Sequence, residues 1–360
     1  MKCGIVGLPN VGKSTLFNCL SNAKALAANY PFATIEPNVG IIPVPDIRLN
    51  KLADLINPKN IHPAMVEIVD IAGLVKGASK GEGLGNKFLA NIRETHAIIH
   101  VLRCFDDENV THVDGSIDPI RDKETIDLEL QLKDLETLQK KKDSLTRVAA
   151  SGNKLAVQEL DIVDGYYKHI LSGKSARSLD ISNDEVILDL NLLTQKPILY
   201  ICNVNESGIN GNKYTQIVQD YLANENADML IISAEVEADI NELDSIGDKE
   251  EFLKDFGLNE PGVNKIIKSA YSLLGLHTFF TAGEKEVRAW TIQKGDLAPQ
   301  AAGVIHTDFE KGFIRAEVIS FDNRIQFKTE QACREAGKIS IEGKNYKVCD
   351  GDVMHFRFNV

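Results

Sequence analysis

The chain has 360 residues, of which 43% are hydrophobic and 26% are charged, and this composition excludes wholesale disorder and collagen-like repeats. Its 40 basic and 52 acidic residues give a net charge of −12, which at first argues against binding to nucleic acid. No apolar stretch is long enough for a membrane span, no signal peptide precedes the first strand, and the cysteines are far apart, so we expect a reduced, cytoplasmic protein without a membrane partner.

Short apolar runs that alternate with helical patterns predict an α/β domain with a largely parallel sheet covered on both faces. The predicted strands cover residues 2–6, 38–43, 65–70, 97–102, 197–202 and 229–233. We therefore assign residues 1–124 and 190–275 to one α/β domain, interrupted by an insertion.

The hydrophobic period changes after residue 125. Leu128, Leu132 and Leu135 form one apolar seam, and a second seam follows a break at residues 151–153. Two such seams predict a coiled-coil-like helical hairpin, inserted over residues 125–189. Strands resume from about Thr278, which predicts a separate, small α+β domain over residues 276–360.

Residues 7–14 read Gly-Leu-Pro-Asn-Val-Gly-Lys-Ser and match the pattern G-x-x-x-x-G-K-[ST] between a predicted strand and a helix. In this arrangement backbone amides surround the phosphates of a nucleotide, and the helix N-terminus adds a partial positive charge. The pattern predicts Lys13 at the β- and γ-phosphates and the Ser14 hydroxyl at Mg²⁺. The predicted phosphate-binding residues are Asn10, Val11, Gly12, Lys13, Ser14, Thr15 and Gly73.

Two later segments occupy the places of the switch elements of a GTPase-type domain. Thr34 lies in a loop before a strand, where its hydroxyl can bind Mg²⁺. Asp70 ends the strand at 65–70 and can hold Mg²⁺ through a water, while the Gly73 amide can face the γ-phosphate. Such contacts order with the triphosphate and are released on hydrolysis. Together these segments predict a Mg²⁺-dependent P-loop nucleoside triphosphatase.

The element that would recognise the base departs from the guanine-binding pattern N-K-x-D. Residues 203–206 read Asn-Val-Asn-Glu, so Val204 replaces the lysine and Glu206 replaces the aspartate. The amide of Asn203 can pair with adenine. We therefore expect ATP in preference to GTP, with a GTP-binding GTPase as the alternative. The predicted base-binding residues are Asn203, Val204, Glu206, Ser233 and Ala234.

On these residues the sequence resembles the YchF/Obg-like ATPase family, within the translation-factor-related P-loop GTPases, over essentially the whole chain. The resemblance rests on residues 7–14, 31–40, 70–78, 103–105, 113–115 and 203–206. Residues 291–300 and 302–314 resemble a TGS domain, a β-grasp module. The resemblance implies an OBG-type G domain followed by a TGS-like domain. It also implies a slow ATPase that binds the ribosome, particularly the large subunit, and regulates translation or a stress response.

Catalysis has a separate sequence signal. Leu74 occupies the position where small GTPases place the glutamine that orients water, so we expect slow intrinsic turnover. His112 lies in the loop after strand 97–102 and is a candidate catalytic residue. Asn10 occupies the position of a K⁺ ligand in K⁺-dependent relatives, which makes K⁺ a possible second cofactor beside Mg²⁺.

The hairpin carries a locally basic segment, with eight basic against four acidic residues between Gln139 and Arg177. Lys140, Lys141, Lys142 and Arg147 are candidate RNA contacts, although a solvated helix surface is the simpler interpretation. One alternative function is an RNA- or ribosome-binding module whose hydrolysis is incidental. A metabolic kinase ranks lower because no pocket for an acceptor substrate is evident.

Overall fold

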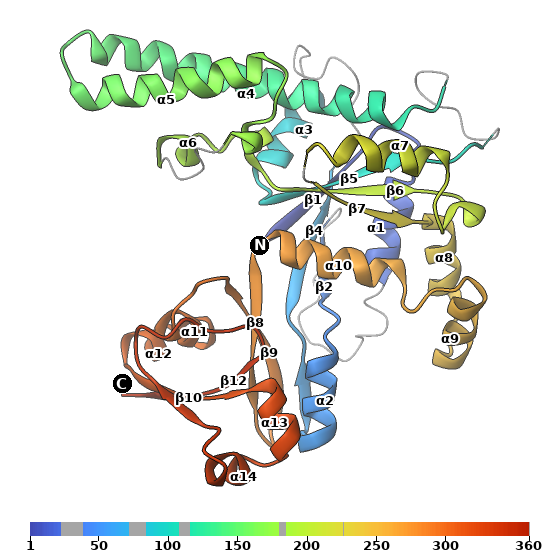
Figure 1. Ribbon diagram of the computed structural model, residues 1–360, viewed down its shortest axis with the longest axis vertical. Coiled ribbons are helices and arrows are strands. Elements are labelled where there is room, and N and C mark those ends of the chain that lie inside the picture. Colours follow the sequence, from blue (N-terminus) through green and yellow to red (C-terminus); the bar gives the residue numbers. More distant parts are fainter. Residues whose placement is uncertain (23–38, 72–83, 108–115, 180–184, 226, 360) are drawn as a thin grey trace. The chain divides into compact units, whose positions relative to one another are not determined.

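The structure is a computed structural model that describes residues 1–22, 39–71, 84–107, 116–179, 185–225 and 227–359. The described residues divide into two compact units. Those within 1–22, 39–40 and 67–266 form the first unit, and those within 41–66 and 267–359 form the second. Figure 1 labels the elements of both units.

Six described strands form one sheet in the order β2-β4-β1-β5-β6-β7, and most of its residues belong to the first unit. Every pairing from β4 to β7 is parallel, as the sequence predicts. Both β5 and β6 are buried along their whole length, as expected of central strands covered on both faces. The strands are β1 (Lys2–Val6), β2 (Val39–Pro43), β4 (Met65–Asp70), β5 (Ala97–Arg103), β6 (Ile198–Asn203) and β7 (Asp228–Ile232).

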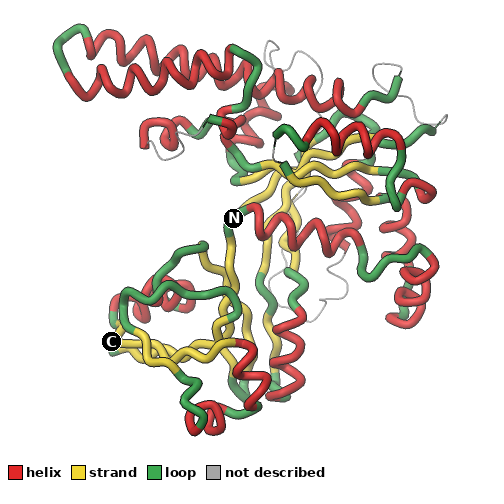
Figure 2. The backbone as a smooth tube through the Cα atoms, in the orientation of Figure 1, coloured by secondary structure: helices red, strands yellow, loops and turns green. Residues whose placement is uncertain are grey.

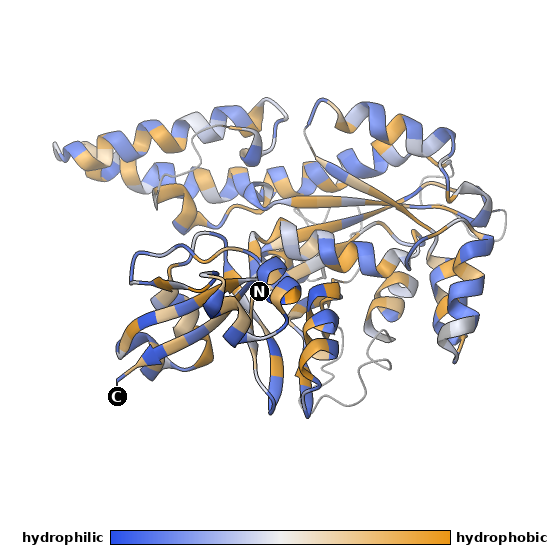
Figure 3. Cartoon of the chain, turned by 60° about the horizontal axis from the view of Figure 1, so that its bottom comes forward, coloured by the Kyte–Doolittle hydropathy of each residue, from blue (hydrophilic) through white to orange (hydrophobic). Residues whose placement is uncertain are grey.

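Helices follow the strands of the first unit, which confirms the predicted alternation. Figure 3 shows hydrophilic and hydrophobic residues interspersed along the helices, a pattern typical of helices that cover a buried sheet. The helices are α1 (Lys13–Asn22), α3 (Leu84–Arg93), α6 (Glu185–Leu190), α7 (Lys213–Leu222), α8 (Ala234–Glu242), α9 (Ile246–Asp255) and α10 (Gly262–Leu273), with the 3₁₀ helices η2 (Ala176–Ser178), η3 (Leu193–Gln195) and η4 (Glu206–Gly208).

The predicted hairpin consists of α4 (Pro119–Ala149) and α5 (Lys154–Leu171), which Figure 2 shows as adjacent helices joined by a short loop. Leu138 and Val163 belong to the apolar core between them. The predicted seam is wrong at Leu128, whose side chain is 53% exposed, whereas Ile126 and Leu130 are buried. The reason is that the first turns of α4 contact β5 and α7, and these contacts set which face of the helix is buried.

The second unit is built on a mixed sheet in the order β11-β10-β12-β8-β9-β3. Its apolar core includes Phe279, Phe313, Phe356 and the alanines of α11, as expected of an α+β unit. The strands are β3 (Asn60–His62), β8 (Leu276–Ala282), β9 (Glu286–Gln293), β10 (Phe313–Ser320), β11 (Ser340–Glu342) and β12 (Asp352–Phe358). The helices are α2 (Ile47–Ile56), α11 (Ala298–Ile305), α12 (Thr307–Lys311), α13 (Phe321–Phe327) and α14 (Glu330–Glu335).

Residues 41–66 belong to the second unit, whereas the sequence pattern predicts them in the nucleotide-binding domain. In this segment β3 pairs in parallel with β9, with Ile61 opposite Val287. The guanidinium of Arg48 also donates to the carboxylate of Asp350 at 2.6 Å. Contacts between residues so far apart in the chain leave no local sequence signal. The predicted limits at residues 125, 189 and 276 stay predictions.

Candidate nucleotide-binding site

The predicted phosphate loop connects β1 to α1, which confirms its strand–turn–helix context. Asn10 and Gly12 have φ angles of 63° and 89°, in the left-handed region that favours glycine. A Cβ at Gly7 would lie 2.9 Å from the carbonyl oxygen of Val101, so the loop passes too close to β5 for a side chain. The loop ends at the N-terminus of α1, where backbone amides without helical partners can bind an anion.

Lys13 and Asp70 form an ion pair that joins the phosphate loop to the end of β4. Both side chains are largely buried, with exposed fractions of 9% and 14%. The carboxylate of Asp70 therefore reaches the cation that is predicted to bind the β- and γ-phosphates. Ser14 and Thr15 are exposed on the first turn of α1, where a ligand can reach their hydroxyl groups.

Asn203, at the end of β6, links residues 203–206, which are predicted to recognise the base, to the phosphate loop through hydrogen bonds. Its Nδ2 donates to the carbonyl oxygen of Val11 at 2.9 Å, and its Oδ1 accepts from the backbone amide of Ala234 at 2.9 Å. The residue is 4% exposed. A Cβ at Gly12 would lie 2.2 Å from Nδ2 of Asn203, so glycine is required there by space as well as by φ. The structure thus brings Asn203, Ala234 and the phosphate loop together.

A cavity of about 680 Å³ lies beside Glu206, which is exposed at the start of η4. It is lined by Asn205, Glu206, Ser207, Ile209, Asn210, Glu235, Asp255 and Phe256. Val204 is 2% exposed, so its side chain has little surface to offer a base, and Ser233 is buried as the N-cap of α8. Asp255 and Phe256 were not predicted at the site, because nothing near them in the chain indicates a nucleotide.

Side chains of the first unit hold the chain that follows β5 in place. The buried guanidinium of Arg103 donates to the carbonyl oxygens of Phe105 and Asp107, at 3.2 and 3.3 Å, and its central carbon lies 4.7 Å from the centre of the Phe105 ring. Tyr214 donates its hydroxyl to Asp106 at 2.6 Å, and this hydrogen bond lowers the pKa of that carboxyl. Residues 103–107 are therefore fixed at several points.

Some predicted site residues cannot be placed. Thr34, Gly73, Leu74 and His112 lie outside the described residues. Their predicted roles in Mg²⁺ binding, γ-phosphate binding and hydrolysis stay predictions.

Three of the four candidate RNA contacts on the hairpin are ion-paired with the hairpin's own acidic residues. The pairs are Lys140 with Glu136 at 2.7 Å, Lys141 with Glu159 at 3.8 Å, and Lys142 with Asp164. Arg147 is exposed near the C-terminal end of α4. Ion pairs near the surface contribute little to stability, so a polyanion could compete for these lysines, although neighbouring carboxylates offset part of their charge.

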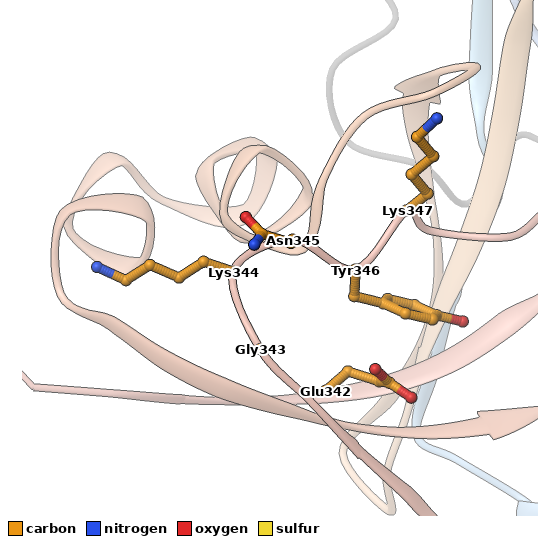
Figure 4. A pocket seen from close by; sticks show the side chains of 6 residues that line it. All are labelled: Glu342, Gly343, Lys344, Asn345, Tyr346 and Lys347. Atoms are coloured by element: carbon orange, nitrogen blue, oxygen red, sulfur yellow. The ribbon is translucent and has the colours of Figure 1, made fainter.

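A second cavity, of about 530 Å³, lies at a loop of the second unit that connects β11 to β12. Its lining comes from residues 342–347, all from one segment of chain. Figure 4 shows the side chains of Lys344 and Lys347 pointing in different directions. Because its charged groups do not converge, this cavity is a weaker candidate for a ligand site than the one beside Glu206.

Two family models match the chain. Residues 2–145 match MMR_HSR1, described as a 50S ribosome-binding GTPase. Residues 276–359 match YchF-GTPase_C, described as a protein of unknown function.

Similarity to individual proteins extends over the whole chain. The chain is 54% identical to the Ribosome-binding ATPase YchF of Haemophilus influenzae, over 100% of this chain and 99% of the relative. It is 51% identical to the Bacillus subtilis protein of the same name, over 100% of both. The solved structure of the Schizosaccharomyces pombe YchF GTPase superposes with a TM-score of 0.91 at 39% identity, covering 99% of this chain and 97% of that one. Among the described helices of this chain, none combines the length and apolar character that crossing a membrane requires.

Proposed function

This chain belongs to the YchF family, and from that membership we propose that it is an ATP-hydrolysing P-loop protein whose binding to the large ribosomal subunit depends on the bound nucleotide. Its relatives are named ribosome-binding ATPases, and one matching family model is described as a 50S ribosome-binding GTPase. Regulation of translation or of a stress response, in the cytoplasm, is the setting that we propose for this activity.

The phosphate end of the site supports Mg²⁺-dependent triphosphate binding. The carboxylate of Asp70 and the hydroxyl of Ser14 are oxygen donors of the kind that Mg²⁺ prefers, and the ion pair with Lys13 shows that Asp70 reaches the loop. When bound, Mg²⁺ would neutralise charge on the β- and γ-phosphates. Lys13 would exchange its partner Asp70 for these phosphates, and Asp70 would then hold a water on the metal.

The observation that carries the preference for ATP is the hydrogen bond from the Ala234 amide to Oδ1 of Asn203. In a GTPase, the backbone of the segment that corresponds to residues 233–235 hydrogen-bonds to O6 of guanine. Here the amide of Ala234 already has an acceptor, so O6 would lack a donor at that point, whereas adenine has no O6 to satisfy. The carboxylates of Glu206 and Glu235 at the cavity can accept from an exocyclic amine of either base, so they would hold the base without setting this preference.

Hydrolysis should be slow in the absence of a partner. Leu74 cannot orient water, and catalysis of phosphoryl transfer consists mostly of positioning and charge stabilisation. We propose His112 as the group that assists the attacking water and Asn10 as a ligand of K⁺. Hydrolysis at equal rates in K⁺ and Na⁺ would exclude that role for Asn10.

The experiment that tests base selectivity is calorimetric titration of the nucleotide-free protein with ATP and with GTP, in Mg²⁺ and K⁺. We expect at least a tenfold preference for ATP, equivalent to about 1.4 kcal/mol. The variant Glu206→Asp, which shortens the carboxylate to the length found in GTPases, should narrow this preference. Glu242→Asp, an exposed residue at the end of α8, is the matched control and should leave it unchanged. Tighter binding of GTP than of ATP by the native protein would contradict the proposed base selectivity and favour the alternative of a GTP-binding GTPase.

A further inference from the structure

The first turns of α4 bury charged residues where they contact the sheet of the first unit. The ammonium of Lys123, which is 2% exposed, contacts the carboxylates of Asp127 and Glu225 at 2.7 and 2.8 Å. The same ammonium lies 5.6 Å from the ring centre of Tyr200 on β6. We call the set of His100, Lys123, Asp127 and Tyr200 the polar joint, because it lies where the first turns of α4 contact β5 and where Lys123 reaches the Tyr200 ring on β6.

The polar joint contains several buried polar atoms that lack a hydrogen-bonding partner among the described residues. They are both ring nitrogens of His100, the hydroxyl of Tyr200 and Oδ1 of Asp127. His100 and Tyr200 are 1% and 0% exposed, so bulk water does not reach them. They face one another on adjacent strands, in register, with ring centres 5.5 Å apart. The unpartnered atoms therefore belong to one region.

Such a concentration of unsatisfied groups is unusual, because a buried polar group without a hydrogen bond destabilises the fold. Proteins commonly solve this problem with an internal water molecule, which makes two to four hydrogen bonds to polar atoms around it. We propose that ordered water occupies the interior between His100, Tyr200 and Asp127 and completes the hydrogen bonding of the polar joint.

The protonation states of the joint fit this occupant. Burial lowers the pKa of His100 to about 4, so the ring is neutral at pH 7, with one nitrogen that donates and one that accepts. Burial also raises the pKa of Tyr200, so its hydroxyl keeps its proton. Water can accept from the donors and donate to the carboxylate and the imidazole. A cation is a poorer occupant, because the ammonium of Lys123 already supplies a positive charge there.

The proposed water contacts a strand that is paired with the strand leading into the phosphate loop. His100 is the register partner of Val6, the residue immediately before Gly7. On one side the water would contact Asp127, at the root of the hairpin. On the other side it would contact His100 on β5, the strand that pairs with β1 at Val6.

The first test is the melting temperature of Tyr200→Phe. If the hydroxyl bonds to water, its removal breaks that network and should lower the melting temperature by about 2 °C. Tyr271→Phe is the reference, because that buried hydroxyl contacts the His277 carbonyl and the Thr278 and Thr291 hydroxyls at 2.9 to 3.1 Å, and its loss should also lower the temperature. A hydroxyl without any partner would give the opposite result. An unchanged or raised melting temperature for Tyr200→Phe, beside a fall for Tyr271→Phe, would overturn the proposal.

The second test is a high-resolution crystal structure of the whole protein. We expect density for a water within hydrogen-bonding distance of the Tyr200 hydroxyl and of at least one of the His100 nitrogens or Asp127 Oδ1. An interior without such density, or direct hydrogen bonds among these side chains, would overturn the proposal.

Discussion

Replacing Gly12 by alanine tests the contact that joins the two halves of the nucleotide site. The new Cβ would meet Nδ2 of Asn203 at 2.2 Å, and the residue would have to keep a φ of 89°. Both effects oppose the native conformation. The clash falls on a buried amide that bonds to Val11 and Ala234 and has no room to retreat.

The two effects have separable magnitudes. An alanine in the left-handed region costs about 1–2 kcal/mol. Displacing the Asn203 amide breaks two hydrogen bonds of 2.9 Å and leaves the Val11 carbonyl and the Ala234 amide buried without partners, at about 1–3 kcal/mol each. We therefore expect Gly12→Ala to lose about 3–8 kcal/mol of unfolding free energy and more than a hundredfold in ATP affinity. Denaturant unfolding and calorimetric titration measure the two losses.

Gly152→Ala is the matched control for backbone strain. Gly152 has a φ of 86°, but no heavy atom lies within 4 Å of the position that a Cβ would take there. We expect this variant to lose about 1–2 kcal/mol and to bind ATP like the native protein. If Gly12→Ala were no less stable than Gly152→Ala and bound ATP normally, the Asn203 bridge would not hold the site together.

Three further predictions follow from individual contacts. Lys13→Met should lower ATP affinity at least a hundredfold, because it removes the cation that Asp70 now holds, and calorimetry showing native affinity would contradict that role. Burial lowers the pKa of His100 from 6.5 to about 4. The contribution of the neutral ring to the free energy of unfolding is therefore fully present above pH 6.5, and up to about 3 kcal/mol of it is lost as the pH falls towards 4. His100→Gln should flatten this dependence in urea unfolding from pH 7.5 to 4, and an unchanged slope would assign it to other groups. Reversing the charges of Lys140, Lys141 and Lys142 to glutamate should weaken ribosome association and reduce its salt dependence, whereas reversing Lys328, Lys338 and Lys344 in the second unit should not. Equal effects of the two triple variants would indicate a general charge effect.

Local patterns were sufficient to predict the elements that position the site. The apolar run before Gly7, the glycines of the phosphate loop and the acidic end of β4 at Asp70 all carry their signal within a few residues. The alternation of strands and helices predicted the parallel sheet for the same reason, since each element shows its own hydrophobic period. The break between the hairpin helices was also predicted, because Gly152 interrupts two clear seams.

Other features depend on residues far apart in the chain and could not be predicted. The partners of Asn203 come from the β1–α1 loop and from the start of α8, so the bridge that it makes has no local signal, and its role at the base stays a prediction. The same holds for Asp255 at the cavity and for β3, which joins the second sheet through β9. At Leu128 the period was correct but its phase was wrong, because contacts with the sheet decide which face of α4 is buried.

The most direct test of the account is ribosome association measured by co-sedimentation with a non-hydrolysable ATP analogue, with ADP and without nucleotide. A protein switched by its nucleotide should bind the large subunit at least tenfold more tightly in one nucleotide state than in the other, and Lys13→Met should abolish the difference. Equal association in all three conditions would contradict the account and favour a ribosome-binding module whose hydrolysis is incidental.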